Sequence, residues 1–246
     1  GSIKLLSGDS ASGLSSGDIV VRGSKTLDGS GSAITVQAGA SVSATGGELR
    51  LASGSSEVSS SGQLNLETGK DSARSGSVNV RSGDASGGAS GQVVLESGSA
   101  TTGSSGSILL RTGTSESGVQ GSISMSVGSS ASSFGGQVTL NSGKGSSGQD
   151  NQLGGDINIF TSNTGDATGG DSGYIKLATG KATSGNSGGI MMTTGDSQLS
   201  AGSIVARAGR SSSSVGGDVI LAAGDSDTST GGSISLHGGT SLLGAS

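Results

Sequence analysis

The stretch "GSILLRTG", from Gly106 to Gly113, is the phrase on which the prediction of the fold depends. Two aliphatic residues, Ile108 and Leu110, stand two positions apart between flanking glycines. In an extended chain this spacing places both side chains on the same face of a strand. The phrase therefore predicts a short β-strand with one apolar face, and the glycines predict corners where the chain turns with positive φ.

The same phrase recurs along the whole chain, for example as "GELRLASG" from Gly47 and "GYIKLATG" from Gly173. About sixteen units can be aligned, most of them spaced by about 15 residues. The first aliphatic column consists of Ile3, Ile19, Ile34, Leu49, Leu64, Val78, Val93, Ile108, Ile123, Val138, Ile157, Ile175, Ile190, Ile204, Val219 and Ile234. The second column consists of Leu5, Val21, Val36, Leu51, Leu66, Val80, Leu95, Leu110, Met125, Leu140, Ile159, Leu177, Met192, Ala206, Leu221 and Leu236.

A unit of this length with one apolar strand cannot bury its apolar face alone, whereas stacked units would turn each column into a continuous ladder. We therefore expect an all-β fold: a single-chain β-solenoid, or parallel β-helix, of about sixteen rungs and narrow cross-section. One sheet lined by Ile, Val and Leu would face a side rich in Ser, Gly and Ala. Residues 1–246 would form one continuous repeat domain, a segment of a longer array, with an irregular bulge at 144–172.

Charged residues occupy one outward position on four successive units and alternate in sign. They are Glu67, Arg81, Glu96 and Arg111. Opposite charges on adjacent strands stabilise a sheet only modestly, so this ladder is expected to specify the register of the strands.

Composition narrows the possible functions. Of the 246 residues 51 are glycine, aromatic residues make up 1%, and proline and cysteine are absent. Such a composition is typical of disordered chains, but disorder does not require two aliphatic columns in register. The net charge of −5 disfavours a nucleic-acid partner, which requires a basic surface. No apolar run is long enough to insert into a membrane, and no signal peptide is recognisable.

Two short motifs resemble catalytic sequences but lack the required context. "GKGSSG", Gly143 to Gly148, has the glycine spacing of a dinucleotide-binding loop, yet no amphipathic helix follows it. "GDSG", Gly170 to Gly173, matches the serine-protease motif, but the only histidine is His237, distant in the predicted stack. Polysaccharide lyases and hydrolases share the predicted architecture, but they use grooves rich in acidic and aromatic residues. We therefore predict that the protein is not an enzyme and has no organic cofactor.

Two further features suggest binding. The period is stretched between Gly136 and Gly173, and carboxylate and amide oxygens in this bulge suit a cation such as Ca²⁺. The candidate ligands are Asp150, Asn163, Asp166 and Asp171, although tolerated surface loops would look the same. A single file of hydroxyl residues could contact ice, but it is not the paired threonine array typical of antifreeze solenoids. Its members are Ser53, Thr68, Ser82, Ser97, Thr112, Thr161, Thr179 and Thr194.

Self-association is the third expectation. Met191, Val205 and Ile220 lie between the two columns on three successive units and would form an outward apolar stripe. The repeat also begins and ends without evident polar caps, which predicts end-to-end joining of the stacks.

The alternation of "SGxIxLxTG" with Ser/Gly phrases resembles the Ser/Gly-rich short-rung β-solenoid repeats of extracellular adhesins, of algal and microbial adhesive or wall proteins, and of viral fibres. The resemblance covers the whole chain and implies a structural or adhesive rod, extracellular or at the cell surface. The partner would be another copy of the chain, an extracellular surface or a glycan. The alternative is a ligand-binding solenoid that recognises an ordered surface of ice, glycan or mineral. A function taken from architecture alone is an analogy.

Overall fold

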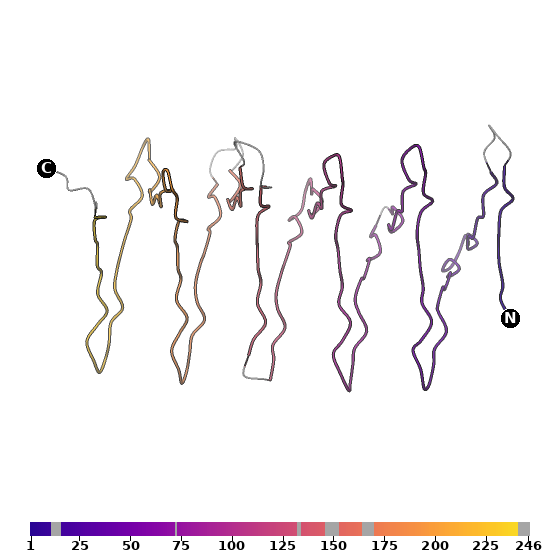
Figure 1. The fold of residues 1–246 in the computed structure, drawn as a ribbon, viewed down its shortest axis with the longest axis horizontal. Coiled ribbons are helices and arrows are strands. Elements are labelled where there is room, and N and C mark those ends of the chain that lie inside the picture. Colours follow the sequence, from indigo (N-terminus) through magenta and orange to yellow (C-terminus); the bar gives the residue numbers. More distant parts are fainter. Residues whose placement is uncertain (11–15, 72, 132–133, 146–152, 164–169, 241–246) are drawn as a thin grey trace. The chain divides into compact units, whose positions relative to one another are not determined.

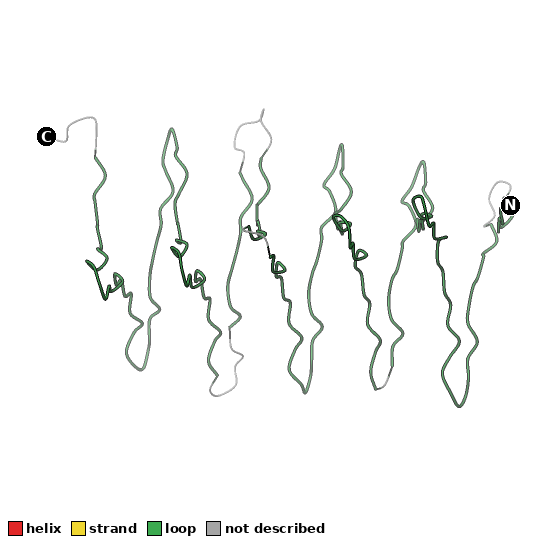
Figure 2. Ribbon diagram, turned by 90° about the horizontal axis from the view of Figure 1, so that it is seen from below, coloured by secondary structure: helices red, strands yellow, loops and turns green. Residues whose placement is uncertain are grey.

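The computed structural model of the chain describes residues 1–10, 16–71, 73–131, 134–145, 153–163 and 170–240. These residues contain no helix and no strand, and the trace consists of loops and bends throughout (Figures 1 and 2). The chain divides into two units of structure, Gly1–Ile123 and Ser124–Ser246, and hydrogen bonds between glycines close loops in both.

No described residue is buried, so the described part of the chain has no core. Its solvent-accessible surface is 25189 Å² for a mass of 23.0 kDa. A compact protein of this mass would expose about 9,600 Å², and a fully unfolded chain about 33,000 Å². The protein is therefore an extended, non-compact chain.

The predicted single-chain β-solenoid is wrong. A solenoid requires a ladder of backbone hydrogen bonds between successive rungs. Only five backbone–backbone hydrogen bonds join described residues, and each connects two glycines at the ends of one Ser/Gly-rich loop. The N–H groups of Gly47, Gly62, Gly155, Gly217 and Gly232 donate to the carbonyls of Gly39, Gly54, Gly143, Gly209 and Gly224, over 2.8 to 3.1 Å. We call these five segments the pinched loops.

The pinched loops explain why the units do not stack on one another within the chain. In a solenoid the Ser/Gly-rich half of each unit must run back along the strand, over roughly 20 Å for six extended residues. In the loop from Gly39 to Gly47, however, the two ends meet at 2.8 Å. The loop therefore produces almost no net displacement, and the next aliphatic stretch begins where the previous one ended instead of lying over it.

Glycine has a different role from the predicted one. Among the described glycines only Gly29 has a positive φ, of 149°. At the pinched loops the second glycine lies where the chain approaches itself closely, although a Cβ on Gly62 would make only an ordinary contact, 3.5 Å from the Cβ of Ser53. A Cβ on Gly47 would lie 3.2 Å from the backbone nitrogen of Gly39, and one on Gly217 would lie 3.3 Å from the Cβ of Ala208.

Serine hydroxyls shape the tips of the loops, where the chain reverses. The backbone N–H of Ala44 donates to the Ser41 hydroxyl over 3.0 Å, and the N–H of Ser59 donates to the Ser56 hydroxyl over 3.0 Å. The same bond from three residues ahead recurs at Ser115, Ser211 and Ser226. Such local side-chain bonds favour turns and compete with regular secondary structure.

Candidate interaction surface

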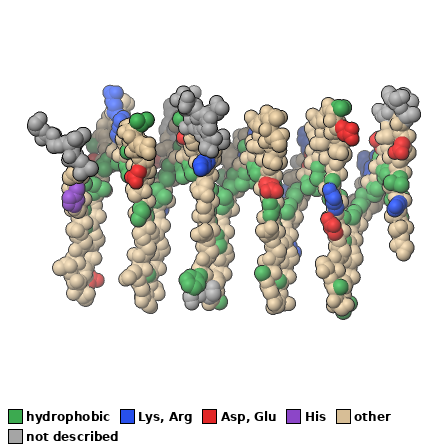
Figure 3. Space-filling view, in the orientation of Figure 1, with side chains coloured by type: hydrophobic (Ala, Val, Ile, Leu, Met, Phe, Trp, Pro, Cys, Tyr) green, Lys and Arg blue, Asp and Glu red, His purple; other side chains and the backbone are tan. Residues whose placement is uncertain are grey.

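The stretches that carry the two aliphatic columns, such as 107–111, are the most apolar part of each unit, and we call them the aliphatic segments. Their side chains are open to solvent. In the first column the exposed fraction is between 48% and 60% in every unit except that of Ile3, where it is 94%. In the second column it is 61% or more for each residue larger than alanine. Figure 3 shows such hydrophobic side chains in view within both units of structure.

The backbone of the aliphatic segments is open as well. None of the backbone–backbone hydrogen bonds among the described residues involves an aliphatic segment. In the unit at 234–237 the hydroxyl of Ser235 lies 3.2 Å from Nδ1 of His237, so these side chains, two positions apart, lie on the same side. That arrangement is typical of extended backbone. Each segment thus offers exposed apolar side chains beside unpaired N–H and C=O groups.

The stripe predicted from Met191, Val205 and Ile220 belongs to this surface. All three side chains are exposed. Association through this stripe stays a prediction.

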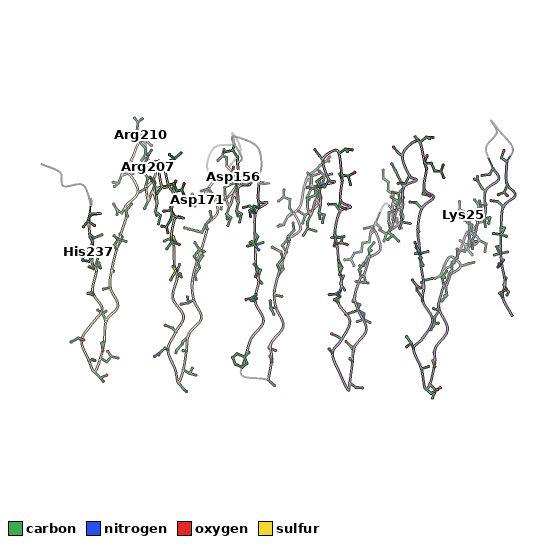
Figure 4. The ribbon with its side chains drawn as sticks, viewed as in Figure 1. Lys25, Asp156, Asp171, Arg207, Arg210 and His237 are labelled. Atoms are coloured by element: carbon green, nitrogen blue, oxygen red, sulfur yellow. The ribbon has the colours of Figure 1, made fainter. Side chains whose placement is uncertain are left out.

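The charges predicted to stack within one chain do not do so. Glu67, Arg81, Glu96 and Arg111 are exposed, and no ion pair joins any of them within the part of the chain that the structure describes. The labelled charged side chains in Figure 4, among them Lys25, are likewise exposed. Because successive units do not lie over one another, the chain cannot bring its own alternating charges together.

The predicted cation site is only partly visible. Asp150 and Asp166 lie outside the described residues, while Asn163 and Asp171 are exposed. Figure 4 labels Asp171. The described residues contain no group of three or more His, Cys, Asp or Glu side chains able to hold a metal ion. Calcium binding in the bulge at 144–172 therefore stays a prediction.

The two motifs that resemble catalytic sequences, "GKGSSG" and "GDSG", do not form a catalytic site among the described residues. Gly143 forms one end of a pinched loop through its carbonyl, while residues 146–148 of the same motif lie outside the described part. In the protease-like motif Ser172 is exposed. His237 is also exposed and its hydrogen bonds go to Ser235, so it is not the partner of Ser172 (Figure 4). No pocket is found in the described part of the chain.

Sequence reasoning missed the role of the hydroxyl file that was considered for ice binding. Its members lie at the base of the loops, against the glycine that opens the next aliphatic segment. A Cβ on Gly76 would meet Cγ2 of Thr68 at 3.5 Å, and one on Gly173 would meet Cγ2 of Thr161 at the same distance. Thr68 and Thr161 are accordingly among the few described residues that are only partly exposed. The repeated offset of eight to twelve residues between this file and a glycine, for example 68 to 76 or 161 to 173, was the available signal.

The part of the chain that the structure describes has no helix with the length and apolar character needed to cross a membrane. Comparisons with models of protein families, with curated proteins and with solved structures give no match to this chain.

Proposed function

We propose that this protein is a structural or adhesive segment of an extracellular fibre, in which many equivalent units share the contact and no unit performs catalysis. The observation that supports the proposal is the repetition of one local geometry. The same glycine pinch closes loops in both units of structure, and each loop is followed by an exposed aliphatic segment.

Repetition of this kind suits adhesion because weak contacts add up when they are joined in one chain. A second contact made by a tethered unit is intramolecular, and its effective concentration can reach the millimolar range for short linkers. An exposed chain with about sixteen such units therefore needs only weak affinity at each. The extracellular location follows from the resemblance of the repeats to those of adhesins, wall proteins and viral fibres, and is part of the proposal.

Recognition of an ordered surface by a flat array of side chains is not favoured by any observation. Its ice-binding form depended on the hydroxyl file, and members of the file such as Thr68 and Thr161 face glycines of their own chain. Ice, glycan and mineral therefore enter only as possible surfaces for adhesion.

Adsorption to a quartz-crystal microbalance tests the proposal. Sensors coated with silica, with a neutral glycan or with cellulose would be loaded with the full chain and then rinsed. We expect a layer on at least one surface that resists rinsing. The matched control is a chain of identical composition whose residue order is scrambled, so that the periodic spacing is lost. Complete removal of the native chain from all three surfaces, or equal retention of the scrambled chain, would contradict the proposal.

A further inference from the structure

The apolar surface and the unpaired backbone of this chain coincide in the aliphatic segments. We infer that these segments pair with the aliphatic segments of other copies of this chain. The copies lie parallel and are shifted by one unit, so that strand pairing forms between chains and not within one. This inference goes beyond the adhesive role and does not depend on which surface the fibre contacts.

The backbone supplies the first argument. The aliphatic segments make no backbone hydrogen bond to any described residue, so both of their edges are open. An extended stretch with open edges is a template for pairing with another chain. The pinched loops, in contrast, already close on themselves through Gly39 and Gly47 or their equivalents. The backbone N–H and C=O groups of the aliphatic segments are thus free to pair with another chain, whereas those at the loop ends already pair with each other.

Periodicity identifies the partner as another copy. A partner that covers successive segments must offer aliphatic residues at the same spacing as this chain, and a copy does so in every unit. The stretched part of the repeat does not disturb this match. The longer loop from Gly143 to Gly155 closes at 2.9 Å, as the loop from Gly54 to Gly62 does. The ends of the longer loop are thus as close together as those of a shorter one.

Charge complementarity identifies the offset between two neighbouring parallel copies. With no shift, each of Glu67, Arg81, Glu96 and Arg111 would face the same residue of the neighbouring copy, and like charges directly opposite one another destabilise a sheet. A shift of two units again sets Glu67 against Glu96. A shift of one unit sets Glu67 against Arg81, Arg81 against Glu96, and Glu96 against Arg111. The same shift sets Val205 against the apolar side chains of the adjacent units, Met191 and Ile220.

The exposed area is sufficient for such an assembly. The chain exposes about 15,600 Å² more than a compact protein of its mass. A stable protein–protein interface of standard size buries about 1,600 Å² in total. Covering even part of the aliphatic segments would therefore provide an extensive interface, as is usual for chains that do not fold alone.

Two charge variants of the full chain test the inference. E67R/E96R carries four arginines in the ladder, and R81E/R111E carries four glutamates. Each variant alone should associate about tenfold or more weakly than the wild type, because every pair between copies becomes repulsive. An equimolar mixture should regain association, because acidic copies then face basic ones. The fourfold exchange E67R/R81E/E96R/R111E keeps the alternation and should associate like the wild type.

Sedimentation velocity would measure association. Far-UV circular dichroism would follow the growth of β-structure with concentration. Isotope labelling of one variant would show mixed species by mass spectrometry. A wild type that stays monomeric at high concentration would overturn the inference, and so would variants that associate normally. Recovery in the fourfold exchange without recovery in the mixture would place the pairing within one chain and also overturn it. Adsorption of the same variants to the coated sensors reports adhesion separately, so that failure of one proposal is distinguishable from failure of the other.

Discussion

The pinched loops and the aliphatic segments, the two halves of each unit, differ in where their hydrogen bonds are made. A loop such as 39–47 closes through its end glycines, and the Ser41 hydroxyl accepts a backbone N–H at its tip. The aliphatic segment that follows, 48–52, has no backbone bond to any described residue. The polar half of the unit is thus organised by local contacts, while the apolar half requires a partner from elsewhere.

Two loops of different length show that closure of a loop does not depend on its exact length. The separation of the bonded glycines is 8 residues in one loop (39 to 47) and 12 in another (143 to 155), yet the N–H to carbonyl distances are 2.8 and 2.9 Å. Closing a somewhat longer loop costs little additional entropy. Insertions are therefore tolerated inside a loop, whereas an insertion in an aliphatic segment would shift its side chains to the opposite face.

The largest effect is expected from a charge in an aliphatic segment. Leu110 is 67% exposed in the single chain, so Leu110→Asp should not change the chain at low concentration. In the assembled state it would place an unpaired charge in an apolar interface, and we expect association to weaken by about a hundredfold. Ser107→Asp, near the start of the same segment, is the control and should have little effect. Equal sedimentation of the two variants would contradict the assignment of Leu110 to the interface.

A smaller loss is expected from the apolar stripe. Val205→Lys removes an exposed apolar side chain from an aliphatic segment, and burial of a valine contributes about 1.5 kcal/mol, or about a tenfold change in association. Val42→Lys provides the comparison, because Val42 is fully exposed at the tip of a pinched loop. Sedimentation equilibrium should show weaker association for the Val205 variant only. If the Val42 variant were equally impaired, the loops and not the segments would make the contact.

Substitution by alanine should have different effects at the two end glycines of a pinched loop. In Gly47→Ala the new Cβ would lie 3.2 Å from the nitrogen of Gly39, so the loop ends must move apart by a few tenths of an ångström, which should weaken a hydrogen bond worth about 1 kcal/mol. A Cβ on Gly39 has no atom within 4 Å, so Gly39→Ala should leave the loop closed. Amide hydrogen exchange at residue 47, measured by NMR, should be faster in the first variant and unchanged in the second. Equal rates would mean that the pinch does not depend on close approach.

The smallest effect is expected at the loop tips. The Ser56 hydroxyl accepts hydrogen bonds from the N–H groups of Val58 and Ser59, over 3.4 and 3.0 Å. Ser56→Ala removes both bonds. We expect it to destabilise the loop tip by about 0.5 kcal/mol, because water can replace the lost hydrogen bonds at an exposed tip. Ser55→Ala is the control, since the Ser55 side chain makes no hydrogen bond to any described residue. The check is faster exchange of the Ser59 amide in the first variant alone.

Part of this arrangement could be predicted from the sequence and part could not. The alternation of Ile108 and Leu110 with other residues correctly marks the apolar half of a unit. Spacing alone, however, does not say which chain supplies the neighbouring segment. A solenoid and a row of separated units have the same columns in sequence, because both repeat the same phrase. The hydrogen bond between the end glycines of a pinched loop distinguishes the two arrangements. The sequence did not reveal whether Gly39 and Gly47 bend the chain or bring it into contact with itself.

By itself the sequence determined the repeat, its aliphatic columns and the alternation of charge from Glu67 to Arg111, because these are properties of spacing and residue type. Only the three-dimensional structure decided that the pinched loops bring the chain back to where they begin and that the units do not form a stacked solenoid. The physical reason is that periodic patterns specify which side chains share a face, whereas the displacement across a loop depends on the summed backbone angles of its residues. In a chain of small residues with few steric restrictions, those angles are set by contacts such as the bond from Gly47 to Gly39.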